Sequence, residues 1–204
     1  MIKKLTIPVD HGNRNMKTTH FLFTTGLSST DRKPAGREDF LQTDGKFYVL
    51  SDKRIPYQRD KTQDERFSIL TRFAIAKELE RTGQVTEEDV VQVSLPIGVP
   101  PKHYAELAER YREYFLGDGK VQELVYNGKT YHTCIRDVAV YPQAYAAMMT
   151  EGEKIRQIPK AVGIDIGGFT SDFLLMRSGS PCLDYCDSME KGVITMYNLS
   201  LIHI

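Results

Sequence analysis

Residues 161–176, with the sequence AVGIDIGGFTSDFLLM, decide the fold of this 204-residue chain. A run of apolar and β-branched residues ends at Asp165, and the chain then passes through Gly167 and Gly168. A second apolar run begins at Phe173. The pattern predicts two strands that are joined by a tight glycine turn.

The same turn carries groups that suit both an anion and a cation. Two adjacent glycines let the backbone approach a ligand closely, and Thr170 and Ser171 add hydroxyl donors. Asp165 and Asp172 supply carboxylates, which can hold a hydrated Mg²⁺. A phosphate with magnesium is therefore one interpretation. The other is a plain hairpin whose turn needs glycine for a positive φ.

A second stretch, Asp10–Lys17, repeats the acid and the glycine turn between two expected strands, 4–9 and 18–25. Lys17 adds a point charge that can meet a β- or γ-phosphate. Taken alone, this stretch is better explained by an ordinary hairpin with a solvated lysine. Two such stretches in one chain predict a protein that grips the phosphates of a nucleotide with two similar halves.

The composition restricts the class of protein. Lys plus Arg and Asp plus Glu number 27 each, which argues against a dedicated nucleic-acid binder or a membrane-surface protein. The first ten residues contain no apolar signal-peptide core, and no apolar run approaches the ~20 residues that span a bilayer. We therefore expect a cytoplasmic protein that contacts neither membrane nor nucleic acid directly.

The three cysteines are too few and too irregularly spaced for a disulfide framework. Cys182 and Cys186 are expected in a strand, and their spacing does not match the usual CxxC pattern of zinc sites. We expect all three, including Cys134, to be buried reduced thiols.

The remaining sequence alternates strand and helix patterns, which is typical of an α/β protein. The expected elements are a helix over 65–81 stopped by Gly83, a strand over 90–95 ending at Pro96, a helix from Pro101 to Leu116, and strands over 121–126 and 130–140 joined by Asn127-Gly128. Residues 27–64 are polar around an Asp-Gly hairpin, and we expect a small exposed insertion whose basic residues form a solvated face.

Gln143 follows Pro142, where a strand is expected to give way to a helix. Backbone N–H groups at the opening of a helix favour an anion, and a glutamine there can orient a water for attack on a γ-phosphate. As a lone residue it is better explained as a surface helix starter. Its functional interpretation depends on its place between the two glycine turns.

Four motifs, taken in order, resemble the N-terminal half of actin-like ATPases, and among these the bacterial ParM-type plasmid-segregation actins. They are Asp10-x-Gly12-x-x-Asn15-x-Lys17, VSLPI at 93–97, YPQA at 141–144 and DIGGFTSD at 165–172. The resemblance implies an actin-like, ribonuclease H-like α/β fold, with a mixed sheet flanked by helices and a small inserted subdomain. Heat-shock chaperone and sugar-kinase ATPase domains are related to this fold.

The resemblance also implies ATP and magnesium in a cleft between two halves. Asp10 and Asp165 would hold the magnesium through water, and Gln143 would position the hydrolytic water, so that Gln143 and Asp165 are the implied catalytic residues. ParM-type proteins often have glutamate at the position of Gln143, which affects the rate more than the role. The implied nucleotide-binding residues are Asp10, Gly12, Asn15, Lys17, Gly167, Gly168, Phe169, Thr170 and Gly192.

The work implied for the family is to polymerise with ATP, to hydrolyse it within the filament, and to move or hold plasmid DNA through a DNA-binding adaptor protein. A small-molecule kinase and a non-catalytic scaffold are alternatives on the same fold.

We expect residues 1–158 to form domain I and residues 159–204 to begin a domain II that needs a further ~100–200 residues. The apolar end, 198–204, has no helix stop signal and is interpreted as the end of a truncated, and in part non-native, reading frame. Isolated, the chain is expected to expose apolar surface, to bind ATP weakly, to be inactive and poorly soluble, and to form no regular filaments.

Overall fold

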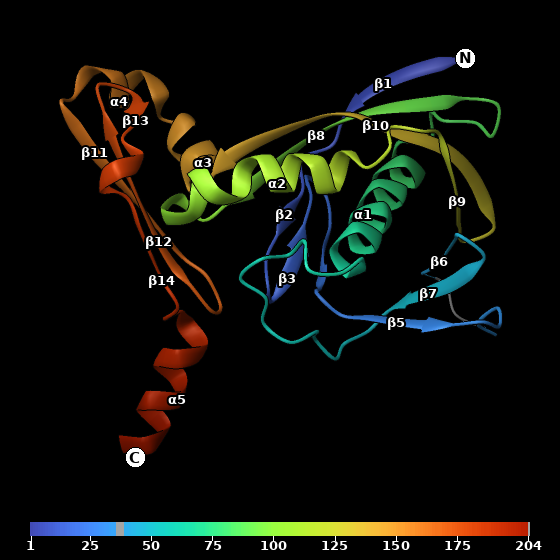
Figure 1. Ribbon diagram of the computed structural model, residues 1–204, viewed down its shortest axis with the longest axis horizontal. Coiled ribbons are helices and arrows are strands. Elements are labelled where there is room, and N and C mark those ends of the chain that lie inside the picture. Colours follow the sequence, from blue (N-terminus) through green and yellow to red (C-terminus); the bar gives the residue numbers. More distant parts are fainter. Residues whose placement is uncertain (36–38, 204) are drawn as a thin grey trace. The chain divides into compact units, whose positions relative to one another are not determined.

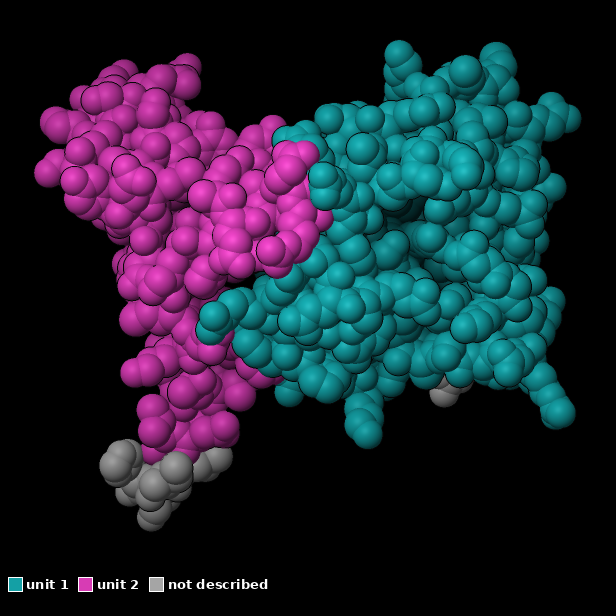
Figure 2. Space-filling view, in the orientation of Figure 1, with its two compact units in different colours: residues 1–97, 111–139 teal, residues 98–110, 140–204 magenta. Residues whose placement is uncertain are grey.

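The computed structural model describes residues 1–35 and 39–203, and the side chains of residues 1–35 and 39–200. The chain divides into two compact units, coloured separately in Figure 2. Unit 1 consists of Met1–Ile97 and Tyr111–Ala139, and unit 2 of Gly98–Arg110 and Val140–Ile204.

The larger sheet is mixed, as the resemblance implies. Among the described residues it has seven strands in the order β1-β8-β10-β9-β6-β7-β5 (Figure 1). β1 pairs with β8 in parallel, whereas β9 pairs antiparallel with both β10 and β6. The strands are β1 Ile2–Thr6, β5 Leu27–Thr30, β6 Phe40–Thr43, β7 Lys46–Leu50, β8 Val90–Val99, β9 Gln122–Tyr126 and β10 Lys129–Pro142.

β8 is longer than predicted. It continues through Pro96 to Val99, with every second side chain buried, so the predicted end at Pro96 is wrong. Proline lacks an N–H group, but its carbonyl can still serve a neighbouring strand. Here the Pro96 carbonyl accepts a hydrogen bond from the Val9 amide at 3.0 Å, which keeps the pairing intact.

Helix α1, Arg66–Thr82, supplies much of the core of unit 1. Its side chains Phe67, Leu70 and Phe73 are fully buried, and it ends at Gly83, whose φ of 61° is the left-handed conformation that favours glycine. Both features confirm the prediction. After the 3₁₀ turn η1, Pro101–His103, helix α2 runs from Tyr104 to Leu116, also as predicted.

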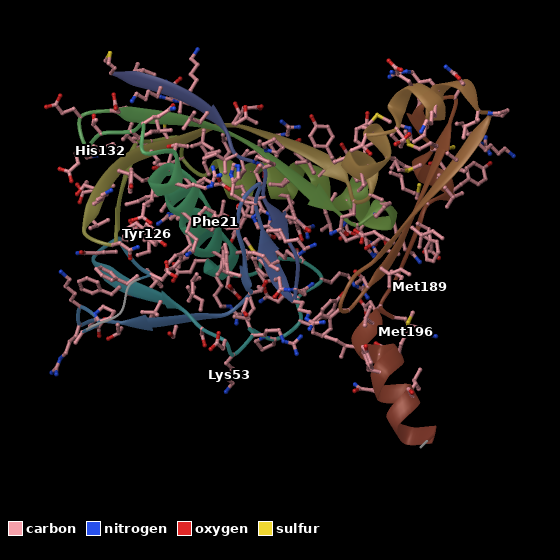
Figure 3. The ribbon with its side chains drawn as sticks, turned by 180° about the vertical axis from the view of Figure 1, so that it is seen from behind. Phe21, Lys53, Tyr126, His132, Met189 and Met196 are labelled. Carbon is pink, nitrogen blue, oxygen red and sulfur yellow. The ribbon has the colours of Figure 1, made fainter. Side chains whose placement is uncertain are left out.

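The segment 27–64 is exposed only in part: residues 28–33 are exposed as predicted, but its hairpin joins the larger sheet. Its Asp-Gly hairpin is present as β6 and β7, but β6 also pairs with β9 and the side chains of Leu41 and Tyr48 are buried. Lys53, Arg54 and Arg59 are exposed, as predicted for the basic face (Figure 3 labels Lys53), whereas Lys61 is buried. Residues 36–38 of this segment lie outside the described residues.

Lys77 of α1 joins the hairpin to the helix. Its ammonium pairs with Asp39 at 2.8 Å and lies 5.5 Å and 5.6 Å from the ring centroids of Phe21 and Tyr126, which Figure 3 labels. These contacts attach Asp39, the residue before β6, to helix α1 within unit 1. Periodicity could not predict them, because their members are distant in sequence.

Unit 2 contains the β-hairpin predicted from residues 161–176. β11, Lys160–Ile166, and β12, Ser171–Arg177, pair antiparallel over their full length, and the short strands β13, Ser180–Pro181, and β14, Asp187–Met189, pair with β12. Helices α3, Tyr145–Met149, and α4, Gly152–Gln157, contribute Met148 and Ile155 to a small core with Leu174 and Met176, and α5 runs from Val193 to His203.

The cysteine prediction is correct only in part. Cys134 is buried, but Cys182 and Cys186 are half-buried, and all three are free thiols. Cys182 and Cys186 flank the 3₁₀ turn η2, Leu183–Tyr185, so their expected strand is also wrong. Of the described helices, none has both the length and the apolar character needed to cross a membrane.

One face of β11 is exposed. Val162, Ile164 and Ile166 are 60%, 59% and 55% exposed, and their spacing of two residues places them on the same face. Met189 and Met196 of unit 2 are exposed as well (Figure 3). This confirms the expectation of exposed apolar surface, and poor solubility stays a prediction that this surface supports.

Ile164→Thr should lower the light scattering of concentrated solutions, because it removes apolar surface while it keeps a β-branched side chain on the strand. The free energy of unfolding should change by less than about 1 kcal/mol. The matched variant Leu174→Ala, in the core behind the same sheet, should cost about 2–5 kcal/mol. Equal scattering of Ile164→Thr and the wild type would contradict this account.

His11 is a buried histidine in the core of unit 1. Its Nε2 lies 2.7 Å from the Thr71 hydroxyl, and that hydroxyl donates to the Phe67 carbonyl, so the Nε2–H is the donor to Thr71. The imidazole stacks on Phe115 with 4.4 Å between ring centroids. Burial, and secondarily the charge of Lys61, lower the pKa of His11 well below its ordinary value.

Unfolding should therefore become easier as the pH falls through about 6.5, because the unfolded chain gains a proton on His11 that the folded protein does not take up. His11→Gln keeps a donor for Thr71 but cannot be protonated, and should reduce the loss of stability between about pH 6.5 and 5. Urea unfolding at several pH values measures this. Parallel curves for the two proteins would exclude His11 as the titrating group.

Candidate functional site

The first glycine turn belongs to a small sheet in unit 1. Among the described residues this sheet consists of β2, Asp10–His11, β3, Asn15–Lys17, and β4, Leu22–Thr24. The predicted loop residues Asn15 and Lys17 thus lie on a strand, and the turn itself is shorter than expected. The strand expected over 18–25 is limited to β4.

Asp10 and Lys17 are opposite one another in β2 and β3. The Lys17 ammonium donates to Asp10 Oδ2 at 2.7 Å, and the side chains of Lys17 and Asp10 are 56% and 43% exposed. An exposed ion pair contributes only about 0–1 kcal/mol, so a phosphate or a hydrated cation can replace either partner at little cost.

The conformation of the first turn requires glycine at position 12. A Cβ atom there would lie 2.5 Å from the Asn15 carbonyl oxygen, closer than real Cβ contacts. The buried Thr25 holds the turn from the other side, with its hydroxyl donating to the Gly12 carbonyl at 2.6 Å and its amide donating to the Arg14 carbonyl at 3.1 Å.

The second glycine turn links β11 and β12 in unit 2, as the sequence predicts. Asp165 is exposed near the end of β11 and is opposite the buried Asp172 of β12. The Gly167 amide donates to the Thr170 carbonyl at 2.8 Å, and the Thr170 hydroxyl donates to Asp172 Oδ2 at 3.2 Å. Carboxylates opposite one another repel, so a cation near this pair would be stabilising.

Gly192 packs directly on the second turn. A Cβ atom at this position would lie 2.5 Å from the Gly167 carbonyl oxygen and 2.6 Å from the Gly168 carbonyl oxygen. The Val193 amide donates to the Gly167 carbonyl and the Ile194 amide donates to the Gly168 carbonyl, both at 3.0 Å. The structure therefore brings three of the predicted glycines together, and the amides that begin α5 are used within the protein.

Gln143 lies in the turn between β10 and α3, directly before Ala144, which is the N-cap of α3 and has a φ of 67°. The strand thus ends at Pro142 and a short helix follows, as the sequence predicts. The Gln143 amide donates to the Val99 carbonyl at 2.8 Å, and its side chain approaches Gly98 closely enough that a Cβ there would lie 3.3 Å from Cγ. Its side-chain Oε1 is buried without a hydrogen-bond partner among the described residues.

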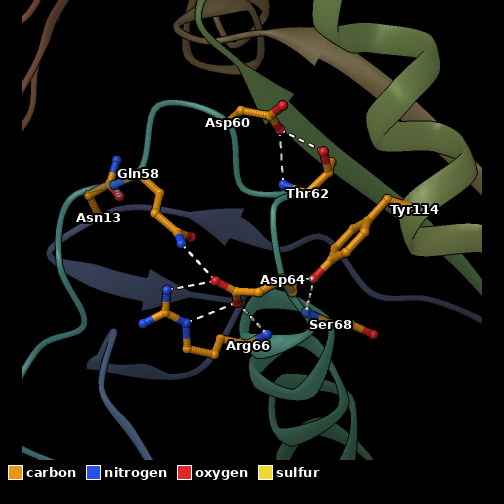
Figure 4. Close-up of polar contacts among 8 residues, drawn as sticks. All are labelled: Asn13, Gln58, Asp60, Thr62, Asp64, Arg66, Ser68 and Tyr114. Atoms are coloured by element: carbon orange, nitrogen blue, oxygen red, sulfur yellow. Dashed lines mark hydrogen bonds and ion pairs between the residues drawn. The ribbon is translucent and has the colours of Figure 1, made fainter.

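Asn13 and Gln58 were missed at the sequence level. Asn13 Oδ1 accepts a hydrogen bond from the backbone amide of Gln58 at 3.0 Å. The side-chain Nε2 of Gln58 donates to Asp64 Oδ2 at 2.8 Å (Figure 4). Arg66 holds both oxygens of Asp64, at 2.9 Å through Nε and 2.6 Å through Nη2. These hydrogen bonds, first from Arg66 and then from Gln58, lower the pKa of Asp64 despite its burial.

The predicted site residues fall into two groups. Asp10, Gly12, Asn15 and Lys17 lie together in unit 1, around the first turn. The second group belongs to unit 2 and consists of Gln143, Asp165, Gly167, Gly168, Phe169, Thr170 and Gly192. Each unit thus contributes one glycine turn with an acid beside it.

Comparison with known proteins identifies related folds. The sequence model of the family described as "Actin like proteins N terminal domain" matches residues 8–145. The solved structure of the apo pSK41 ParM protein is similar, with a TM-score of 0.74 and 14% identity over 99% of this chain and 71% of that chain. An AlfA filament bound to AMPPNP gives a TM-score of 0.70 and 16% identity over 98% and 75% of the two chains.

The archaeal actin homologue Ta0583 in complex with ADP gives a TM-score of 0.67 and 19% identity, covering 93% of this chain and 61% of that chain. Among curated proteins, a sequence search finds no match. The chain thus spans 61% to 75% of the lengths of these three structures, and at such identities the likeness concerns the fold. Because the family model matches more than half of its residues, the chain belongs to the actin-like proteins and carries their N-terminal domain.

Proposed function

We propose that this chain is the N-terminal, nucleotide-binding part of a filament-forming actin-like ATPase that segregates plasmid DNA. The observation that carries the proposal is the pair of acid-and-glycine turns, one in each unit, within a chain of the actin-like family. Two similar structures are an AlfA filament bound to AMPPNP and Ta0583 in complex with ADP, which supports an adenine nucleotide as the ligand.

The residues of both turns suit ATP with magnesium. Asp10 and Asp165 carry exposed carboxylates for a hydrated cation, and Lys17 carries an exposed ammonium for a phosphate oxygen. Gly12 and Asn15 would border the phosphates at the first turn, and Gly167, Gly168, Phe169, Thr170 and Gly192 at the second. Bound magnesium would neutralise charge on the phosphates.

Gln143 is assigned to the attacking water. Its buried Oε1, which has no hydrogen-bond partner among the described residues, can accept a hydrogen bond from one water and so fix the direction of that water. An amide cannot take the proton, so Gln143 contributes orientation and not general-base catalysis. This limits the expected rate of hydrolysis more than the affinity for ATP.

Self-association and an adaptor complete the proposal. Similar structures include filaments of AlfA and Alp12, which supports assembly of this protein with itself. Equal numbers of acidic and basic residues give it no charge preference for DNA, which suits contact with plasmid DNA through a separate adaptor protein. These whole-protein activities are proposed for the full-length gene product, in the cytoplasm.

The function is tested by adding ATP and magnesium to the full-length protein and recording phosphate release together with light scattering. We expect both signals to rise, with scattering first and release following within the filament. Release that requires an added sugar or acid substrate would instead indicate a kinase. No response in either signal would indicate a non-catalytic scaffold.

Asp165→Ala should abolish the magnesium dependence of nucleotide binding, because it removes a carboxylate assigned to the hydrated ion. The measurement is titration of a fluorescent ATP analogue with magnesium and with EDTA. Asp118→Ala, at an exposed turn of unit 1, removes an equivalent charge elsewhere and should have no effect. Unchanged binding in Asp165→Ala would exclude the assigned role.

Gln143→Ala should slow hydrolysis by about 10²-fold and leave the ATP affinity within about twofold, since orientation of water acts in the transition state. Steady-state phosphate release and equilibrium titration separate the two effects. Loss of rate and affinity in equal measure would identify a structural glutamine that supports the β8 and β10 ends.

A further inference from the structure

We propose that Asn13 is a positioning residue. Its side chain accepts a hydrogen bond from the segment that precedes α1, a contact called the grip below, and so holds the first glycine turn in the conformation that binds the ligand. The inference rests on the proposed function, because it concerns the turn assigned to the nucleotide phosphates. It adds a residue with a defined role to the site.

The grip is a hydrogen bond between two segments that are distant in sequence. Asn13 Oδ1 accepts a hydrogen bond from the backbone amide of Gln58 at 3.0 Å, so the Asn13 side chain is directed into the protein. Gln58 is only 8% exposed, and a buried amide that loses its acceptor is costly, by about 1–3 kcal/mol. Asn13 therefore satisfies the backbone donor of a buried residue.

Gln58 is itself fixed by the start of α1. Its side-chain Nε2 donates to Asp64 Oδ2 at 2.8 Å, and Figure 4 shows the side-chain amide of Gln58 directed at that carboxylate. Asp64 Oδ1 also accepts the Arg66 backbone amide at 2.9 Å, which ties the carboxylate to the first turn of the helix. A continuous series of hydrogen bonds thus connects the glycine turn to α1.

A second connection reaches the same helix from the other side of Gly12. His11 donates to the Thr71 hydroxyl at 2.7 Å, and Thr71 lies on α1. The two residues that flank Gly12 are therefore both anchored to α1, directly or through Gln58 and Asp64. A turn fixed in this way loses little entropy when a ligand binds, which favours affinity.

The simpler explanation is that Asn13 merely suits a tight turn, as asparagine often does. Two substitutions distinguish the explanations. Asn13→Gly keeps the conformational freedom of a turn residue but removes the acceptor, whereas Asn13→Asp keeps an acceptor oxygen in the same place. If Asn13 only suits the turn, both substitutions should leave the turn unchanged. If Asn13 holds the turn through its hydrogen bond, only Asn13→Asp should do so.

The experiment is hydrogen–deuterium exchange of the chain without nucleotide. In Asn13→Gly the peptide covering residues 12–15 should exchange about 10-fold faster, which corresponds to the loss of one hydrogen bond. In Asn13→Asp it should stay within about twofold of the wild type, and peptides of α1 should be unchanged in both. Asp118→Ala, which removes a side chain that accepts the Lys120 amide at another turn, should leave residues 12–15 unaffected.

Titration of the full-length protein with the fluorescent ATP analogue completes the test. Asn13→Gly should weaken binding by about 3- to 10-fold, with the maximal hydrolysis rate unchanged, and Asn13→Asp should restore most of the affinity.

Similar exchange of residues 12–15 in the glycine and aspartate variants would overturn the inference, and so would faster exchange that extends equally through α1. If the exchange pattern is as expected but the wild type itself binds no nucleotide, the grip is established and the proposed function is what fails.

Discussion

Two places where backbone meets backbone leave no room for a side chain, and both glycine turns depend on them. At Gly12 the obstacle is the Asn15 carbonyl, and at Gly192 it is the carbonyls of Gly167 and Gly168, each at 2.5–2.6 Å from where a Cβ would stand. Close approach of this kind compacts each turn and brings its neighbouring acid, Asp10 or Asp165, to a defined position. Asp10 and Asp165 can hold defined positions only because Gly12 and Gly192 allow these close backbone contacts.

Helix α1 gives the first turn its support. It carries Thr71 beneath His11 and begins at the Asp64–Arg66 pair that fixes Gln58. The same helix holds the β6–β7 hairpin through Lys77 and Asp39. A single buried element therefore positions both the first glycine turn and the hairpin within the segment predicted to be an exposed insertion.

Local rules predicted the elements whose causes are local. The Asn-Gly turn between β9 and β10, the glycine stop of α1 and the hairpin of β11 and β12 all follow from residues adjacent in sequence. The misses have distant causes. Pro96 stays within β8 because the Val9 amide donates to its carbonyl, and the β6–β7 hairpin joins the larger sheet because β6 pairs with β9.

By itself the sequence determined the class of the fold, the two acid-and-glycine turns and the order of the motifs, because glycine placement and apolar periodicity act over a few residues. Only the tertiary structure decided that Asn15 and Lys17 lie on a strand, that Gly192 joins Gly167 and Gly168, and that Asn13 is directed toward Gln58. These outcomes depend on which distant backbone amides and carbonyls need partners once they are buried, and no local pattern of residues encodes that requirement.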